Sequence, residues 1–170
     1  MNPSQRSESR GERHTACEGA IKVVLALTGE RQVGTSLSEI REDHLQRYLF
    51  AASHIAPGSR VLDCACGVGY GTAILARLAL HVVGVDCSPE AIAFAQEHWD
   101  APNIDYVVAD AQALPALGEF DVVVSFETLE HLDHPEKMID ALRARVLIGS
   151  VPNEQFVPFS PDGHPFHKRH

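Results

Sequence analysis

The sequence predicts an α/β protein with a doubly wound, mainly parallel sheet and helices on both faces. Short apolar runs recur along residues 60–151, and segments with helical spacing separate them. The runs are almost continuously apolar instead of alternating with polar residues, which is typical of strands buried on both faces. Ligands of such sheets bind outside the carboxyl ends of the strands.

Three segments of different character divide the chain. Residues 1–15 are rich in Ser, Arg and Glu, and we expect them to be disordered. Residues 16–56 are expected to form an N-terminal helical cap, in which apolar residues at helical spacing predict a helix over 37–55, with Ser36 and Glu39 as its capping box. Residues 57–170 then form the ligand-binding domain.

The elements of this domain alternate between strands and helices. Strands are predicted over residues 60–65, 81–86, 104–110, 120–126 and 145–151. Helices are predicted over 71–79, 88–99 and 134–144, the second opened by Ser88 as cap and Pro89 at its first position.

Composition narrows the class of partner. The 170 residues suffice for one domain with a real core. The formal net charge of −9 disfavours nucleic acid and anionic membranes as partners. The four cysteines suggest neither a disulfide framework nor paired zinc ligands, so we expect a cytoplasmic protein in which Cys64 and Cys66 are small buried thiols. The apolar run 20–27 is too short to span a bilayer.

The stretch VLDCACGVGYGT, residues 61–72, joins the first strand to the next helix. Its glycines let the backbone approach a ligand and bring helix amides toward it. Asp63, Asp86 and Asp110 stand at or near the ends of three successive strands, so we expect them to project at one edge of the sheet. The alternative is that each of these acids only caps the helix that follows.

Two cofactor classes compete for this loop. A dinucleotide fingerprint needs GxGxxG, whereas this loop has GxGxG and Thr72 at the place of the third glycine. Asp63 would also repel a pyrophosphate and attract an ammonium group. A carboxylate at the end of the second strand, Asp86, accepts hydrogen bonds from a ribose diol. S-adenosylmethionine carries both a ribose and an ammonium, while a nicotinamide-dependent oxidoreductase stays open as a weaker alternative.

With these motifs, residues 29–170 resemble the class I S-adenosylmethionine-dependent methyltransferases, which have a Rossmann-like fold, and particularly those members that act on small molecules. VLDCACGVGYG resembles the first motif, with Ala65 where a glycine is more usual, VVGVDCS the second, VVADAQALP the third, and FDVVVSFETLEHLDHPEKMI the fourth. The resemblance places Asp110 beside the adenine amino group and His131 on the acceptor side. The cofactor-binding residues it implies are Tyr48, Asp63, Ala65, Gly67, Gly69, Asp86, Cys87, Asp110, Ala111, Phe126 and Glu127.

Two further stretches are similar to a subset of the family linked to glycan and O-antigen biosynthesis. The segment from TGERQVG to RYLFA is similar to the helix that closes over the methionine end of the cofactor, with Arg31 and Tyr48 as its notable residues. The closing segment 150–170 is similar to the NPFHxRxY stretch of the subset. The resemblance thus implies methyl transfer to a hydroxyl of a sugar or another metabolite, with self-association left open.

Histidines supply the candidate proton acceptor. Methyl transfer from a sulfonium is a one-step in-line displacement, so alignment and exclusion of water dominate. A base that takes the proton of an acceptor hydroxyl helps, and His131 is the candidate catalytic residue, although a packing role is an equal alternative. No metal site is expected, because Pro165 argues against a helix that would align His164, His167 and His170.

Two features depart from the family pattern. Only five strands can be placed, whereas the family's sheet has two more, so its last strands are absent from this chain. The predicted helix 134–144 also runs directly into the predicted strand 145–151, without room for a turn. We therefore expect a longer parent sequence with extra residues near 143–146 and after 170. The competing hypothesis is a non-catalytic cofactor-binding scaffold.

Overall fold

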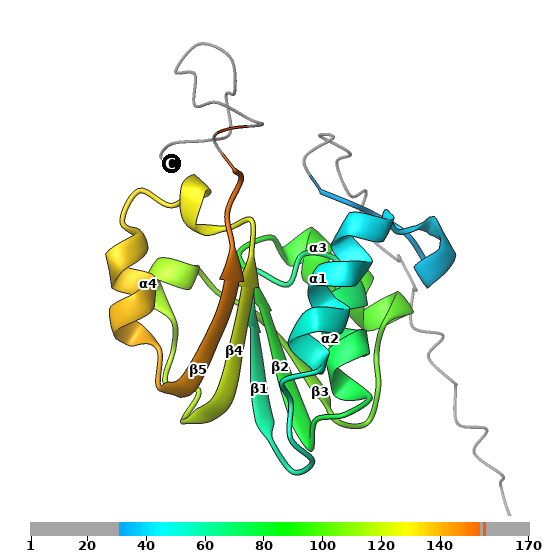
Figure 1. Cartoon of the computed structure of the whole chain (residues 1–170), viewed down its shortest axis with the longest axis horizontal. Coiled ribbons are helices and arrows are strands. Elements are labelled where there is room, and N and C mark those ends of the chain that lie inside the picture. Colours follow the sequence, from blue (N-terminus) through cyan, green and yellow to red (C-terminus); the bar gives the residue numbers. More distant parts are fainter. Residues whose placement is uncertain (1–30, 154, 156–170) are drawn as a thin grey trace, which may run out of the picture.

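The computed structural model describes residues 31–153 and 155, and the expectations for residues 1–15 and for the C-terminal histidines lie outside them. Five strands form one sheet in the order β3-β2-β1-β4-β5, as Figure 1 shows, and every neighbouring pair is parallel. The predicted fold class is therefore confirmed. The strands are β1 (Arg60–Cys64), β2 (His81–Asp86), β3 (Ile104–Val108), β4 (Phe120–Phe126) and β5 (Ala144–Ser150).

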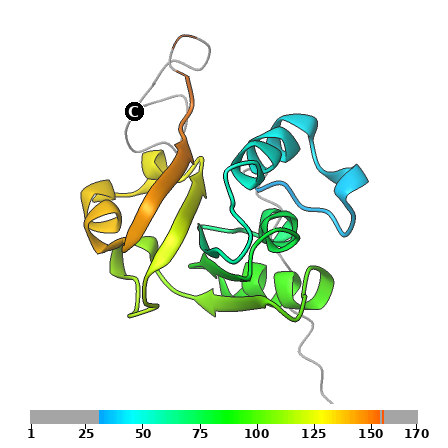
Figure 2. The same cartoon turned by 60° about the horizontal axis from the view of Figure 1, so that its bottom comes forward.

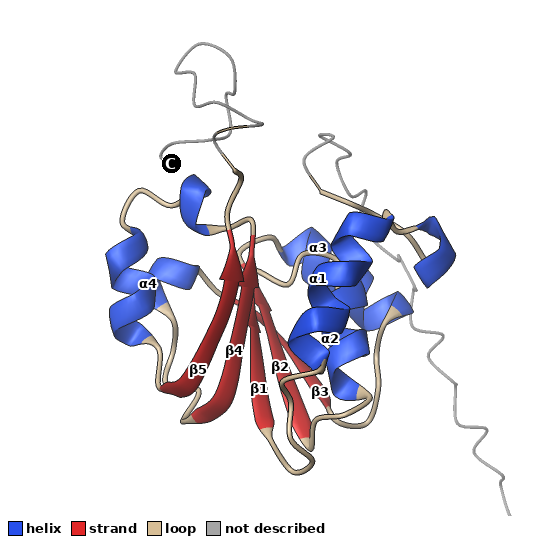
Figure 3. Cartoon of the chain, in the orientation of Figure 1, coloured by secondary structure: helices blue, strands red, loops and turns tan. Residues whose placement is uncertain are grey.

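Helices cover both faces of the sheet (Figures 2 and 3). One face packs against α1 (Glu42–Ala52), α2 (Tyr70–Ala76) and α3 (Pro89–His98), and the other against α4 (Pro135–Ala141). Short 3-10 helices lie at η1 (Leu37–Glu39), η2 (Ala111–Ala113) and η3 (Leu129–His131). None of the helices in the described ranges has the length and apolar character needed to cross a bilayer.

The alternation of side chains along each strand divides the core into two clusters. Val61 of β1 faces the cluster under α1 and α2, while its neighbour Leu62 faces the cluster under α4, where Met138 is fully buried. Because both faces are apolar, the strands appear in the sequence as continuous hydrophobic runs. This explains why each predicted strand overlaps an observed one.

The predicted helix over residues 37–55 is wrong in its first part. A 3-10 turn occupies Leu37–Glu39, and extended backbone at Ile40 and Arg41 separates it from α1. The Ser36 side chain makes no capping hydrogen bond, and the Glu39 carboxylate instead accepts from the backbone N–H of Thr35 at 2.7 Å. This local contact closes the turn before a continuous helix can start.

Two other boundaries are settled by local contacts. The predicted cap of α3 is confirmed, since the Ser88 hydroxyl accepts from the Ala91 amide at 3.1 Å and Pro89 occupies the first turn. The expectation that α4 leaves no room for a turn before β5 is wrong. The helix ends at Ala141, and two residues complete the connection, with the Arg143 carbonyl accepting from the Phe120 amide at 2.8 Å.

Candidate functional site

A cavity of about 330 Å³ opens at the carboxyl ends of β1, β2 and β4. The segment before η1, one side of α1, the loop after β1 and the loop after β4 contribute to its wall. The position agrees with the site expected for a doubly wound sheet. Of the residues predicted from the sequence, the structure brings these together around the cavity: Tyr48, Ala65, Gly67, Cys87, Phe126, Glu127 and His131.

Three residues of the loop after β1 have a positive φ angle, each in a different environment. Gly67 has a φ of +57°, and a Cβ at that position would meet no atom within 4 Å, so this stretch of backbone is open. Gly69 has a φ of +91° and caps α2, and a Cβ there would crowd Ala95 and Tyr106. Ala65 adopts a φ of 66°, a left-handed conformation that costs a residue with a Cβ about 1–2 kcal/mol. The loop therefore holds strained backbone beside the cavity.

Asp63 does not project from the strand end as expected. It precedes the last residue of β1, and its side chain lies on the α1 face, fully buried. Its carboxyl accepts hydrogen bonds from the Thr72 hydroxyl at 2.7 Å and the Tyr48 hydroxyl at 3.2 Å. Burial raises the pKa of Asp63 to about 7, against the effect of these two donors. Asp63 thus joins α1, β1 and α2 beneath the loop and is not part of the cavity wall.

Asp86, the last residue of β2, lies directly beneath the glycine loop. Its carboxylate accepts from the backbone N–H groups of Gly67 and Ser88, both at 2.9 Å. A third donor is the Arg31 guanidinium at 3.1 Å. The resemblance made Arg31 a notable residue of the leading segment, and the structure places its guanidinium on the carboxylate at the end of β2.

Asp110 and Ala111 lie apart from the cavity wall. The Asp110 carboxylate caps η2 by accepting from the Gln112 amide at 2.8 Å, which is the capping geometry of the alternative interpretation. Ala111 is buried in the cluster under α4. Cys64 and Cys66 are buried free thiols, as predicted, and burial raises the pKa of Cys64 to about 12.

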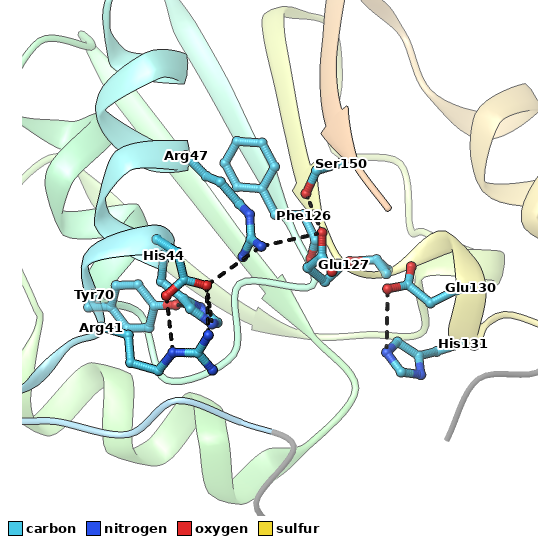
Figure 4. A network of polar contacts seen from close by, with 11 residues as sticks. Arg41, His44, Arg47, Tyr70, Phe126, Glu127, Glu130, His131 and Ser150 are labelled. Atoms are coloured by element: carbon cyan, nitrogen blue, oxygen red, sulfur yellow. Dashed lines mark hydrogen bonds and ion pairs between the residues drawn. The ribbon is translucent and has the colours of Figure 1, made fainter. Parts of the chain in front are cut away.

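Several polar residues of the wall were not predicted from the sequence, chiefly His44 and Arg47 of α1. The Arg47 guanidinium lies 3.9 Å from the Glu127 carboxylate, which also accepts from the Ser150 hydroxyl at 2.6 Å (Figure 4). His44 Nδ1 lies 3.0 Å from the Tyr70 hydroxyl, and burial lowers the pKa of His44. The spacing of His44, Arg47 and Tyr48, which puts them on one side of a helix, was the available signal.

His131 lies at the end of η3 and contributes to the wall opposite α1. Its Nε2 atom is 3.8 Å from a carboxylate oxygen of Glu130, whose side chain is buried (Figure 4). His131 thus borders the cavity and has the carboxylate of Glu130 close to its ring. Within the part of the chain that the structure describes, no group of three or more His, Cys, Asp or Glu residues is arranged to hold a metal ion.

The chain is similar to known methyltransferases. A family model described as a methyltransferase domain matches residues 61–147, about half of the chain. A probable S-adenosylmethionine-dependent methyltransferase of Mycobacterium tuberculosis is 31% identical over 179 residues, covering 98% of this chain and 64% of that protein. A ubiquinone biosynthesis O-methyltransferase of Xanthomonas campestris pv. campestris is 31% identical over 148 residues, covering 83% and 60%. The chain thus spans less than two thirds of the length of these curated relatives.

A solved structure with bound ligand shares the architecture. The N-methyltransferase NodS of Bradyrhizobium japonicum, crystallised in complex with S-adenosyl-L-homocysteine, is 26% identical with a TM-score of 0.51. The similarity covers 58% of this chain and 50% of NodS.

Proposed function

Because the chain belongs to the class I S-adenosylmethionine-dependent methyltransferases, we propose that it transfers a methyl group from S-adenosylmethionine to a hydroxyl of a small molecule. The observation that carries the proposal is the cavity at the carboxyl ends of β1, β2 and β4, where the open backbone of Gly67 is part of the wall. The Asp86 carboxylate is not itself a wall residue, but it lies directly behind Gly67 and accepts from its amide. A nucleoside could approach the backbone at Gly67 closely and donate hydrogen bonds from its ribose diol to the Asp86 carboxylate.

The residues around the cavity suggest how the cofactor would be held. Asp86 would accept hydrogen bonds from the ribose hydroxyls. Arg47 would bind the cofactor carboxylate, since its guanidinium lies 3.8 Å from Asp43 and 3.9 Å from Glu127, outside hydrogen-bonding distance of either acid. The rings of Tyr48 and Phe126, packed edge to face with centroids 5.0 Å apart, would exclude water from the reacting atoms.

An oxygen acceptor is supported by the relatives named as O-methyltransferases of ubiquinone biosynthesis. A sugar or glycan acceptor is the finer proposal, and it rests on the similarity of the leading segment to the O-antigen subset. For any hydroxyl, the displacement is in line and the proton leaves late, so a neutral imidazole at the acceptor side helps. His131 is the residue that we propose for this role.

The test begins with calorimetric titration of the chain with S-adenosylhomocysteine and, for comparison, with NAD. Methyl transfer from S-adenosylmethionine is then assayed over glycan and phenolic acceptors. We expect saturable binding of S-adenosylhomocysteine but not of NAD, and turnover on at least one hydroxyl acceptor. Binding without turnover on any acceptor would favour a non-catalytic scaffold, and binding of NAD instead would favour an oxidoreductase.

The role of His131 is tested by His131→Ala beside a matched control, His134→Ala, whose histidine precedes α4, makes no side-chain capping hydrogen bond and is not part of the cavity wall. Loss of a general base lowers turnover by roughly 100-fold or more, while affinity for S-adenosylhomocysteine stays unchanged. The control variant keeps its turnover. If His131→Ala retains turnover within a few-fold of the unaltered chain, the base assignment is wrong.

A further inference from the structure

The Asp86 carboxylate is almost fully engaged within the protein itself. Oδ1 accepts from the Ser88 amide at 2.9 Å and from the Arg31 guanidinium at 3.1 Å, while Oδ2 accepts from the Gly67 amide at 2.9 Å. A carboxylate offers about four lone-pair positions. Three of them are therefore occupied by donors of this chain.

A ribose diol needs two of these positions, because each hydroxyl donates one hydrogen bond to the carboxylate. The two backbone amides belong to the loop after β1 and to the residue that caps α3, and both are fixed by the fold. The Arg31 side chain is the exchangeable donor, since it lies on the segment before η1 and has 37% of its surface exposed.

We propose that the Arg31 guanidinium competes with the cofactor ribose for Asp86, and that Arg31 leaves the carboxylate when the cofactor binds. The inference rests on the proposed function and adds a residue that sets cofactor affinity. The guanidinium neutralises the buried acid in the structure, and a bound diol would take its hydrogen-bonding position.

The exchange requires only a small part of the chain to move. The Gly34 carbonyl accepts from the Trp99 indole N–H at 3.0 Å, and Glu39 holds the Thr35 amide at 2.7 Å. These contacts fix the segment from Gly34 onward to the end of α3 and to η1. Release of Arg31 is thereby confined to the side chain and the residues just before Gly34.

The experiment compares Arg31→Ala with the unaltered chain and with Arg41→Ala. Arg41 is a second arginine ahead of α1, bound to Asp43 at 2.8 Å and not part of the cavity wall. Affinity is measured by calorimetry with S-adenosylhomocysteine, which lacks the sulfonium charge that an arginine would repel. We expect Arg31→Ala to bind it about 2- to 5-fold more tightly, as loss of a partly exposed ion pair implies, and Arg41→Ala to bind it as the unaltered chain does.

Two nucleosides separate competition from other effects of the substitution. The gain in affinity of Arg31→Ala should appear with adenosine and vanish with 2′,3′-dideoxyadenosine, which has no diol. An equal gain with both nucleosides would overturn the inference, as would equal or weaker binding of S-adenosylhomocysteine by Arg31→Ala. Failure of the unaltered chain and of Arg31→Ala to bind S-adenosylhomocysteine at all would overturn the proposed function and this inference with it.

Discussion

Asp63 shows how a single position in a strand determines the chemistry of its side chain. The carboxyl is fully buried between β1, α1 and α2, where Thr72 and Tyr48 donate to it, and burial raises its pKa to about 7. A carboxyl with a raised pKa is held more easily in its protonated form. Its effect on folding therefore depends on pH.

We predict that the free energy of unfolding falls between pH 4 and pH 7 because of Asp63. In this range the folded protein keeps a proton that the unfolded chain, with an ordinary pKa of 3.8, has released. Stability therefore decreases as pH rises, by up to a few kcal/mol, and levels off above the folded pKa. Urea unfolding of Asp63→Asn should lack this decrease, since an amide does not titrate.

The matched control for that experiment is Asp140→Asn, which alters an exposed carboxylate of α4. It should follow the pH profile of the unaltered chain. Parallel profiles for the unaltered chain and Asp63→Asn would show that Asp63 does not titrate in this range.

The location of a site residue could be predicted from the sequence only where its position relative to a strand determines that location. Cys87 immediately follows β2 and Gly67 lies three residues after the end of β1, so their place at the cavity follows from the sheet topology. Asp63 could have been assigned to the same face as Val61, the one that α1 and α2 cover, because it lies two residues after Val61 and side chains alternate along a strand. The pairing of Arg31 with Asp86 joins residues 55 positions apart and depends on how the leading segment folds back, which no local pattern indicates.

At the scale of elements, the strands were predictable and the N-terminal helix was not. A strand buried on both faces has an apolar sequence that few other structures share. The segment 37–55 has apolar residues at helical spacing throughout, yet the contact between Glu39 and Thr35 ends its first turn. His44 and Arg47 share one side of a helix with Tyr48, but polar residues on a helix have the same pattern whether they face solvent or a cavity, so this spacing alone did not identify them.

The packing of α1 on α2 depends on one glycine. A Cβ added at Gly71 would overlap the ring of Tyr48, whose hydroxyl donates to Asp63. We predict that Gly71→Ala lowers the free energy of unfolding by about 1–3 kcal/mol, because overpacking displaces Tyr48 and exceeds the gain in helix propensity. Urea unfolding measures the change.

A double-mutant cycle isolates this contact. In a Tyr48→Ala background the added methyl group has room, so Gly71→Ala should cost little or stabilise α2. Equal destabilisation in both backgrounds would mean that the Tyr48 ring is not what excludes a side chain at Gly71.

At the scale of the whole molecule, the β5 edge of the sheet carries exposed apolar side chains. Within the described residues β3 and β5 are the outer strands, and β5 pairs with β4 alone. Val146 and Leu147, on opposite faces of β5, have 46% and 43% of their surfaces exposed. An edge strand with exposed apolar residues favours pairing with another chain.

We therefore predict that the 170-residue chain self-associates along β5 at high concentration and that Val146→Lys suppresses this association. A charged side chain on an edge strand opposes pairing, and removal of a half-exposed valine disturbs the core little. Sedimentation equilibrium should give a lower average mass for Val146→Lys than for the unaltered chain. Leu80→Lys, which replaces a 64% exposed leucine outside the strands with the same charge, serves as the matched control and should keep the mass of the unaltered chain. If all three proteins have one mass at every concentration, the exposed edge of β5 does not mediate association.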